Sequence, residues 1–116
     1  MNQFQPGIKF KTVEDFLDYL PEEELMVVEA LRELIFDCLP GVEERLNYNA
    51  PFYFGHKRMF FIWPASLPWG KVDQGVRLGF SHADLPDQTF AAGVLPDLAL
   101  ARGLLFEAAH LDGFQG

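Results

Sequence analysis

The fold is decided by residues 45–81, which read RLNYNAPFYFGHKRMFFIWPASLPWGKVDQGVRLGFS. Between Arg45 and Phe54 the even positions are apolar, and most of the odd positions carry polar groups. Because successive side chains of a strand point to opposite faces, this period of two predicts one strand whose even residues face a core. We expect its odd residues to face water, a ligand or a partner.

Two more strands follow in the same stretch. Residues 55–57 supply a turn, and residues 58–63 are apolar on both faces, as in a central strand that is covered on both sides. Residues 76–81 alternate again between apolar and small or polar side chains. We infer that these strands are arranged antiparallel.

Helical patterns flank this sheet on both sides. Thr12 is the expected N-cap of a short amphipathic helix, and Pro21 opens a second helix that begins with three glutamates. Residues 89–95 predict a short edge strand, and Pro96 begins a last helix that stops at Gly113. The predicted fold class is α+β, an antiparallel sheet of about four to five strands with two N-terminal helices and one C-terminal helix.

Length and composition favour one domain over residues 1–116, with residues 1–11 as an irregular arm. The single cysteine, Cys38, excludes an internal disulfide and occupies an apolar helical position, so we expect a buried thiol and a reducing compartment. Neither a secretory signal nor a membrane-spanning run is visible in the sequence. The sequence therefore predicts a cytoplasmic protein without a membrane partner.

The net charge of −8 comes from the first part of the chain. Residues 1–44 carry 11 acidic and 3 basic groups, and residues 45–116 carry 6 of each. A phosphate backbone would be repelled by the first part and not attracted by the second, so we expect no nucleic-acid partner.

No motif of the common enzyme classes is present, neither a phosphate-binding glycine loop nor a zinc-protease or serine-hydrolase signature. Ser81 and His82 are adjacent in or beside a strand and point to opposite faces, so together with Asp84 they form no local triad. The scattered His56 and His110 are explained by a turn and by a helix end. The sequence favours a protein without catalytic residues and without a required cofactor.

A ligand-binding surface is the more specific expectation. Trp63 and Trp69 bracket a loop that contains two prolines, and the loop could form a wall beside the polar face of the sheet. The candidate residues are Asn47, Asn49, Tyr53, Trp63, Trp69 and Arg77. They suit a small molecule or an apolar side chain of a protein partner, and the sequence leaves a homodimer open. The alternatives are that the last helix covers this face and that the tryptophan folds back onto the sheet.

Pro51 interrupts the alternating run at a position where it cannot donate a ladder hydrogen bond. The first strand must therefore lie at a sheet edge there or contain a bulge. A bulge would direct Asn49 and Tyr53 to the same side, and Pro51 would then shape the proposed site. The alternative is an ordinary edge-strand proline.

Four segments resemble one protein family. They read LPEEELMVVEALRELI (residues 20–35), EERLNYNAPFY (43–53), FFIWPASLPWG (60–70) and GVRLGF (75–80). Through them the chain resembles the YdhG-like family, small bacterial domains of largely uncharacterised function, over residues 12–112. The resemblance implies an α+β domain with an antiparallel sheet and helices from both ends of the chain.

One branch of that family is proposed to act as a frataxin-like iron chaperone. The resemblance thus implies an alternative function, iron binding or delivery by carboxylates of an acidic helix and the neighbouring strand. The candidates are Glu22, Glu23, Glu29, Glu33, Asp37, Glu43 and Glu44, and the predicted ligands among them are Glu29, Glu33 and Asp37. Carboxylate oxygens would hold iron weakly and exchangeably. By the residues alone, such a stripe at i,i+4 spacing is typical of a solvated helix face.

Overall fold

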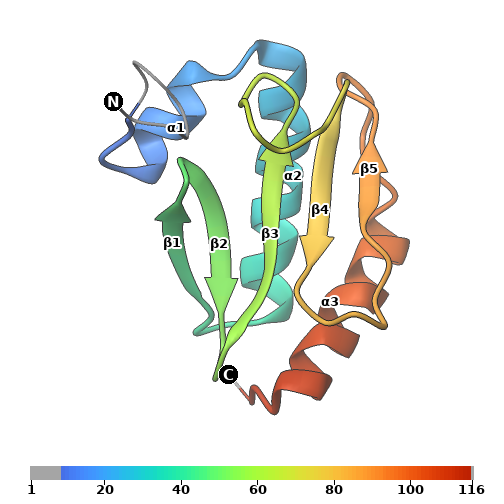
Figure 1. The fold of residues 1–116 in the computed structure, drawn as a ribbon. Helices are drawn as coiled ribbons and strands as arrows, with labels where there is room; N and C mark the ends of the chain where they lie inside the picture. Colours follow the sequence, from blue (N-terminus) through green and yellow to red (C-terminus); the bar gives the residue numbers. More distant parts are fainter. Residues whose placement is uncertain (1–8, 116) are drawn as a thin grey trace.

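The computed structural model describes residues 9–115, and over them the chain forms an α+β domain (Figure 1). The elements are α1 (Val13–Tyr19), α2 (Glu22–Cys38), β1 (Glu43–Asn47), β2 (Ala50–Phe54), β3 (Arg58–Pro64), β4 (Val76–Phe80), β5 (Gln88–Phe90) and α3 (Leu98–Asp112). The strands form one antiparallel sheet in the order β1-β2-β3-β4-β5, so every strand pairs with its neighbours in the sequence. The predicted fold class is confirmed.

The helices begin and end where capping residues allow them to. The Thr12 hydroxyl accepts a hydrogen bond from the Asp15 backbone N–H at 3.1 Å, and the Asp97 side chain accepts one from the Leu100 N–H at 3.0 Å. α3 ends at Gly113, whose φ of 79° is left-handed and favours glycine. Within the described part of the chain, every helix is too short or too polar to reach across a bilayer.

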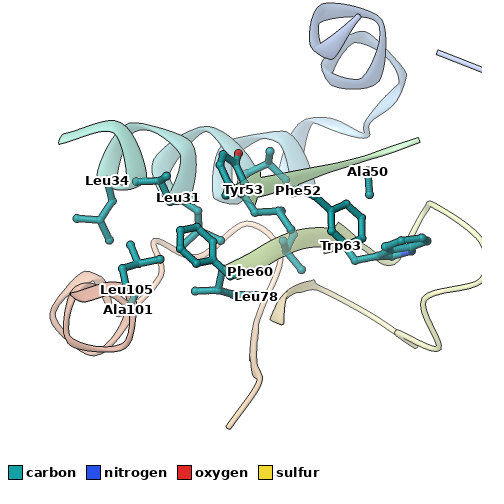
Figure 2. Close-up of a cluster of buried hydrophobic side chains, with 14 of the residues drawn as sticks. Leu31, Leu34, Ala50, Phe52, Tyr53, Phe60, Trp63, Leu78, Ala101 and Leu105 are labelled. Carbon is teal, nitrogen blue, oxygen red and sulfur yellow. The ribbon is translucent and has the colours of Figure 1, made fainter. Parts of the chain in front are cut away.

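The core lies between the sheet and two helices. α2 and α3 contact one another and cover the same face of the sheet (Figure 1). Leu31 of α2 and Leu105 of α3 are fully buried there, and so are Tyr53, Phe60 and Leu78 on three successive strands (Figure 2). On each strand, every second side chain points to this face, and the side chains between them point away from the helices.

The segment predicted as one strand from Arg45 to Phe54 is a hairpin. β1 and β2 pair with Asn47 opposite Ala50, around Tyr48 and Asn49 at φ 55° and 67°. Positive φ at both central positions is typical of a two-residue turn whose twist matches that of the flanking strands. The prediction of a single strand was wrong because the alternation of apolar and polar residues runs on through a turn that contains no glycine.

Pro51 does not lie in an edge strand, because β2 pairs with β1 on one side and with β3 on the other. The pairing with β3 starts only at Phe52, so the missing N–H of Pro51 removes no hydrogen bond from that ladder. The register shift expected near it lies further on, between Tyr53 and Phe54, where Met59 is the extra residue on β3. At residue 51 β2 is thus paired on the β1 side only, as the prediction of a local edge requires, although β2 is an interior strand, and the irregularity occurs further along β2.

The edges of the sheet are β1 and β5. β5 pairs with β4 over residues 88–90 only, and the rest of the predicted strand 89–95 belongs to the connection to α3. Gly93, at a left-handed φ of 76°, donates its N–H to the Glu23 carbonyl at 3.0 Å. This contact draws the connection toward the first turn of α2, so the strand ends early.

A first prediction concerns Gly79 of β4, which lies directly against the Phe61 ring. A Cβ atom at residue 79 would come within 2.1 Å of that ring, so we expect Gly79→Ala to displace it and to lower the free energy of unfolding by about 1–3 kcal/mol in urea titrations. Gly103 in α3 is the matched control, since no atom lies within 4 Å of a Cβ built there. Gly103→Ala should leave stability unchanged or raise it by up to about 1 kcal/mol. Equal effects of the two changes would contradict the packing described.

Candidate functional site

The sheet face opposite α2 and α3 carries three arginines and a group of aromatic rings. We call it the arginine face and define it by Arg45, Arg58, Arg77, Phe52, Phe54, Phe61 and Trp63. Arg45 pairs with Phe52, which in turn pairs with Phe61. Trp63 pairs with Arg77 on the next strand. Directly paired residues share a face, so these side chains lie on one side of the sheet.

Three of the rings form a continuous apolar floor. Phe52 and Phe61 stack with centroids 4.9 Å apart, and Trp63 stands edge-on to both, at 6.5 and 6.4 Å. Glycines make room for the rings: a Cβ at Gly70 would come within 2.2 Å of the Trp63 indole, as one at Gly79 would meet Phe61. Phe52 and Trp63 are only 4% and 6% exposed, so the floor is closely packed and shallow.

Arg58 and Arg77 each place their guanidinium over a ring of this floor, and Arg45 places its guanidinium over the neighbouring Phe54 ring. The distances from Cζ to the ring centroid are 4.5 Å for Arg45 over Phe54, 5.3 Å for Arg58 over Phe52 and 5.4 Å for Arg77 over Phe61. Stacking occupies the plane of a guanidinium and leaves its N–H edge able to bind carboxylate or phosphate oxygens. The face therefore combines an apolar base with cationic hydrogen-bond donors.

The three arginines differ in their polar partners. Arg45 donates twice to Glu43, at 2.7 and 2.9 Å, and this pair is exposed. Arg77 forms an ion pair with Asp87. Arg58 is exposed, and among residues 9–115 it forms no ion pair. Arg58 is thus the guanidinium of this face whose charge the described chain does not balance.

The β3–β4 loop borders the arginine face at one end (Figure 1). Trp63 Nε1 donates to the Leu67 carbonyl at 3.0 Å, and Arg77 Nη1 donates to the Gly70 carbonyl at 3.1 Å. Between these two anchors the loop turns outward at Trp69, whose φ is 79° and which is 59% exposed. Trp63 is therefore folded onto the sheet, whereas Trp69 is presented to solvent.

A buried carboxylate holds this loop against the helices. Glu24 of α2 accepts hydrogen bonds from the Ser66 backbone N–H at 3.2 Å and from its hydroxyl at 2.8 Å. The Tyr19 hydroxyl donates to the Ser66 carbonyl at 3.3 Å. Three hydrogen bonds to one residue fix the base of the loop that carries Trp69.

The structure brings three of the six predicted ligand residues together. Trp63, Trp69 and Arg77 meet at the loop end of the arginine face, because Trp63 pairs with Arg77 and both are tied to the loop. The sequence analysis missed Arg45 and Arg58 as members of the same surface. The two-residue turn at Tyr48 and Asn49 places Arg45 directly opposite Phe52 of β2. A prediction of that turn would therefore also have predicted Arg45 as a member of this surface.

The other three predicted residues differ in position. Asn47 ends β1 and pairs with Ala50, so it shares the sheet side of Arg45, two strands away from Trp63. Asn49 lies in the turn, where its Oδ1 accepts a hydrogen bond from the Phe10 N–H at 2.9 Å. Tyr53 is fully buried on the helix-covered face. The prediction that Tyr53 shares a face with Arg77 was wrong, because the hairpin sets the two on opposite sides of the sheet.

Tyr53 belongs to a buried polar network instead. Its hydroxyl donates to Glu44 Oε2 at 2.7 Å, and Arg32 of α2 donates to both oxygens of that carboxylate at 2.8 Å. Burial raises the pKa of the Tyr53 phenol well above its ordinary value, with the Glu44 charge adding to the shift and Arg32 opposing it. The hydrogen bond to Glu44 raises the pKa of Arg32. The network connects α2 to β1 and β2, and we interpret its role as structural.

The candidate iron ligands Glu29, Glu33 and Asp37 are all exposed on α2. Over residues 9–115, no three His, Cys, Asp or Glu side chains are grouped so that they could hold a metal ion. The iron function implied by the resemblance gains no support from this arrangement.

Cys38 was expected to be a buried thiol and is only partly buried, near the end of α2. Desolvation raises the pKa of the thiol, Asp37 adds to this shift, and Arg102 of α3 opposes it. A raised pKa disfavours the reactive thiolate form of Cys38.

Removal of the Tyr53 hydroxyl tests the buried network. Because burial raises the pKa of Tyr53, the folded chain keeps the proton above pH ~10, where the unfolded chain loses it. The stability that Tyr53 contributes is complete below that pH and is lost as the pH rises toward the folded pKa, by up to about 1.4 kcal/mol per pH unit. Tyr53→Phe should lack this slope in urea titrations from neutral to alkaline pH, and at neutral pH it should be about 1–2 kcal/mol less stable. Tyr48→Phe, a change at an exposed tyrosine, should keep the slope.

Removal of the loop anchor should loosen Trp69 without unfolding the domain. We expect Glu24→Ala to lower the free energy of unfolding by about 1–3 kcal/mol and to speed amide exchange at Ser66. Glu29→Ala, one turn further along α2 and exposed, is the matched control and should change neither quantity. Unchanged exchange at Ser66 in Glu24→Ala would show that the carboxylate does not hold the loop.

Comparison with known proteins adds no family to this description. No protein-family model matches the chain, and neither a curated protein nor a solved structure matches it significantly. The resemblance to the YdhG-like family therefore stays a prediction.

Proposed function

We propose that this domain is a non-catalytic binding module that docks its arginine face on an acidic surface of a protein partner. The observation that carries the proposal is Arg58, which is stacked on Phe52, exposed, and without an ion pair among the described residues. A carboxylate of a partner could bind the N–H edge of this guanidinium in bidentate fashion while the stacked ring keeps the group in place.

The shape of the face favours a protein over a small molecule. Small ligands bind in concave sites, whereas Phe52 and Trp63 form a closely packed floor that offers little depth. A protein surface can cover the arginines and the exposed Trp69 together. Arginine and aromatic residues are enriched in such interfaces and supply much of their binding energy.

The charge distribution also selects the orientation of an acidic partner. The chain has a net charge of −8, and all of this acidic excess comes from residues 1–44. An acidic surface is repelled by that part of the protein and attracted only where arginines gather. Repulsion between the acidic partner and the acidic residues of 1–44 disfavours other binding orientations. The difference in charge between these residues and the arginine face therefore provides specificity.

The test begins with a random peptide library selected on the full-length protein. We expect the recovered peptides to be rich in Asp and Glu beside apolar residues. Trp63 lies in this face and Trp69 lies in the loop that borders it, so tryptophan emission should change as each peptide is titrated. Arg58→Gln should weaken the binding about tenfold, which corresponds to ~1.4 kcal/mol.

The matched control is Arg102→Gln. Arg102 lies over the Phe106 ring at 5.6 Å on α3, so this change removes the same kind of contact away from the sheet. Peptide affinity should be unchanged in it. Recovered peptides without acidic residues, or an equal loss of affinity in the two variants, would refute the proposal.

A further inference from the structure

The β3–β4 loop, which carries Trp69, is called the tryptophan loop below. A cleft of about 220 Å³ lies at the opposite end of β3 from this loop. Its walls come from the β2–β3 turn, the segment that follows β4 and the C-terminal end of α3. Its polar lining consists of Lys57, Arg58, Ser81, His82 and Asp112, and its base is apolar. The cleft is separate from the aromatic floor of the arginine face, and Arg58 lies at the border of the two.

Hydrogen bonds hold the three walls in place. Asp112 accepts one from the His56 N–H at 2.7 Å and one from the Lys57 N–H at 2.9 Å, which fixes the β2–β3 turn to α3. The Ser81 N–H donates to the Met59 carbonyl at 2.9 Å and joins the end of β4 to β3. The cleft is therefore preorganised by the fold.

The lining has more hydrogen-bond donors than acceptors. Within residues 9–115, Lys57 and Arg58 have no ion pair. The His82 Nδ1 accepts a hydrogen bond from the Asp84 N–H at 3.1 Å, so the neutral ring carries its proton on Nε2 and is a donor there. The one carboxylate, Asp112, already accepts a backbone N–H on each oxygen.

We propose that this cleft binds a small molecule through an oxyanion, either a phosphate or a carboxylate group. Such a group accepts several hydrogen bonds and would meet the ammonium of Lys57 and the Nε2–H of His82, with the Ser81 hydroxyl as a further donor. The volume exceeds that of the oxyanion alone, which leaves room for an apolar part against the base. This inference does not depend on the arginine face, because Lys57 and His82 lie outside it.

The test is a titration of the isotope-labelled full-length protein, at constant ionic strength, with inorganic phosphate in one arm and acetate in the other. We expect saturable chemical-shift changes at Lys57, Ser81 and His82 with a millimolar dissociation constant in at least one arm. Saturation by phosphate only, or by acetate only, identifies the oxyanion that the cleft prefers. Saturation in neither arm overturns the proposal.

Matched variants separate a site from general charge screening. Lys57→Gln and His82→Gln should each weaken binding about fivefold to tenfold, and Lys71→Gln should leave it unchanged because Lys71 lies in the tryptophan loop. All three side chains are exposed, and circular dichroism would verify the fold of each variant. Equal weakening by Lys57→Gln and Lys71→Gln would show that phosphate or acetate responds to net charge alone, and the proposal would fail.

Discussion

The hydroxyl of Tyr53 is the constraint from which the arrangement of the sheet follows. It lies beneath α2, out of reach of water, and needs an acceptor, which Glu44 provides. That carboxylate is itself largely buried and needs a positive charge, which Arg32 provides from α2. Three partners from one helix and two strands thus satisfy one another, and removal of any one leaves a buried polar group without its match.

Because side chains alternate along a strand, fixing Tyr53 on the helix side fixes Phe52 on the other. The pairing of strands then carries this choice across the sheet, from Arg45 through Phe52 and Phe61 to Arg77 at the tryptophan loop. The arginine face is in this sense the reverse side of the core. Its residues are positioned by packing that takes place on the opposite surface.

The fold class could be predicted from the sequence because its signals are local. The capping role of Thr12, the left-handed stop at Gly113 and the alternation along residues 76–80 each depend on a few neighbouring residues. The turn at Tyr48 and Asn49 escaped prediction because alternation has the same form on both sides of a two-residue turn, and neither residue is a glycine.

The candidate site could be predicted only in part, for the same reason. Trp63, Trp69 and Arg77 come together through one strand pair and one loop, and those are visible in the order of residues. The position of Tyr53 and the membership of Arg58 depend on which face each strand turns to the helices. Tertiary contacts and the register shift at Met59 determine which side chains face the helices. Neither of them produces a periodic pattern in the sequence.

The two outer strands limit how this sheet can associate. β1 places the exposed charged residues Glu43 and Arg45 on one outer edge of the sheet, and β5 is only 3 residues long. Charged and very short edge strands are the devices by which natural sheets resist edge-to-edge aggregation. A continuous sheet shared between two molecules is thus disfavoured at both ends.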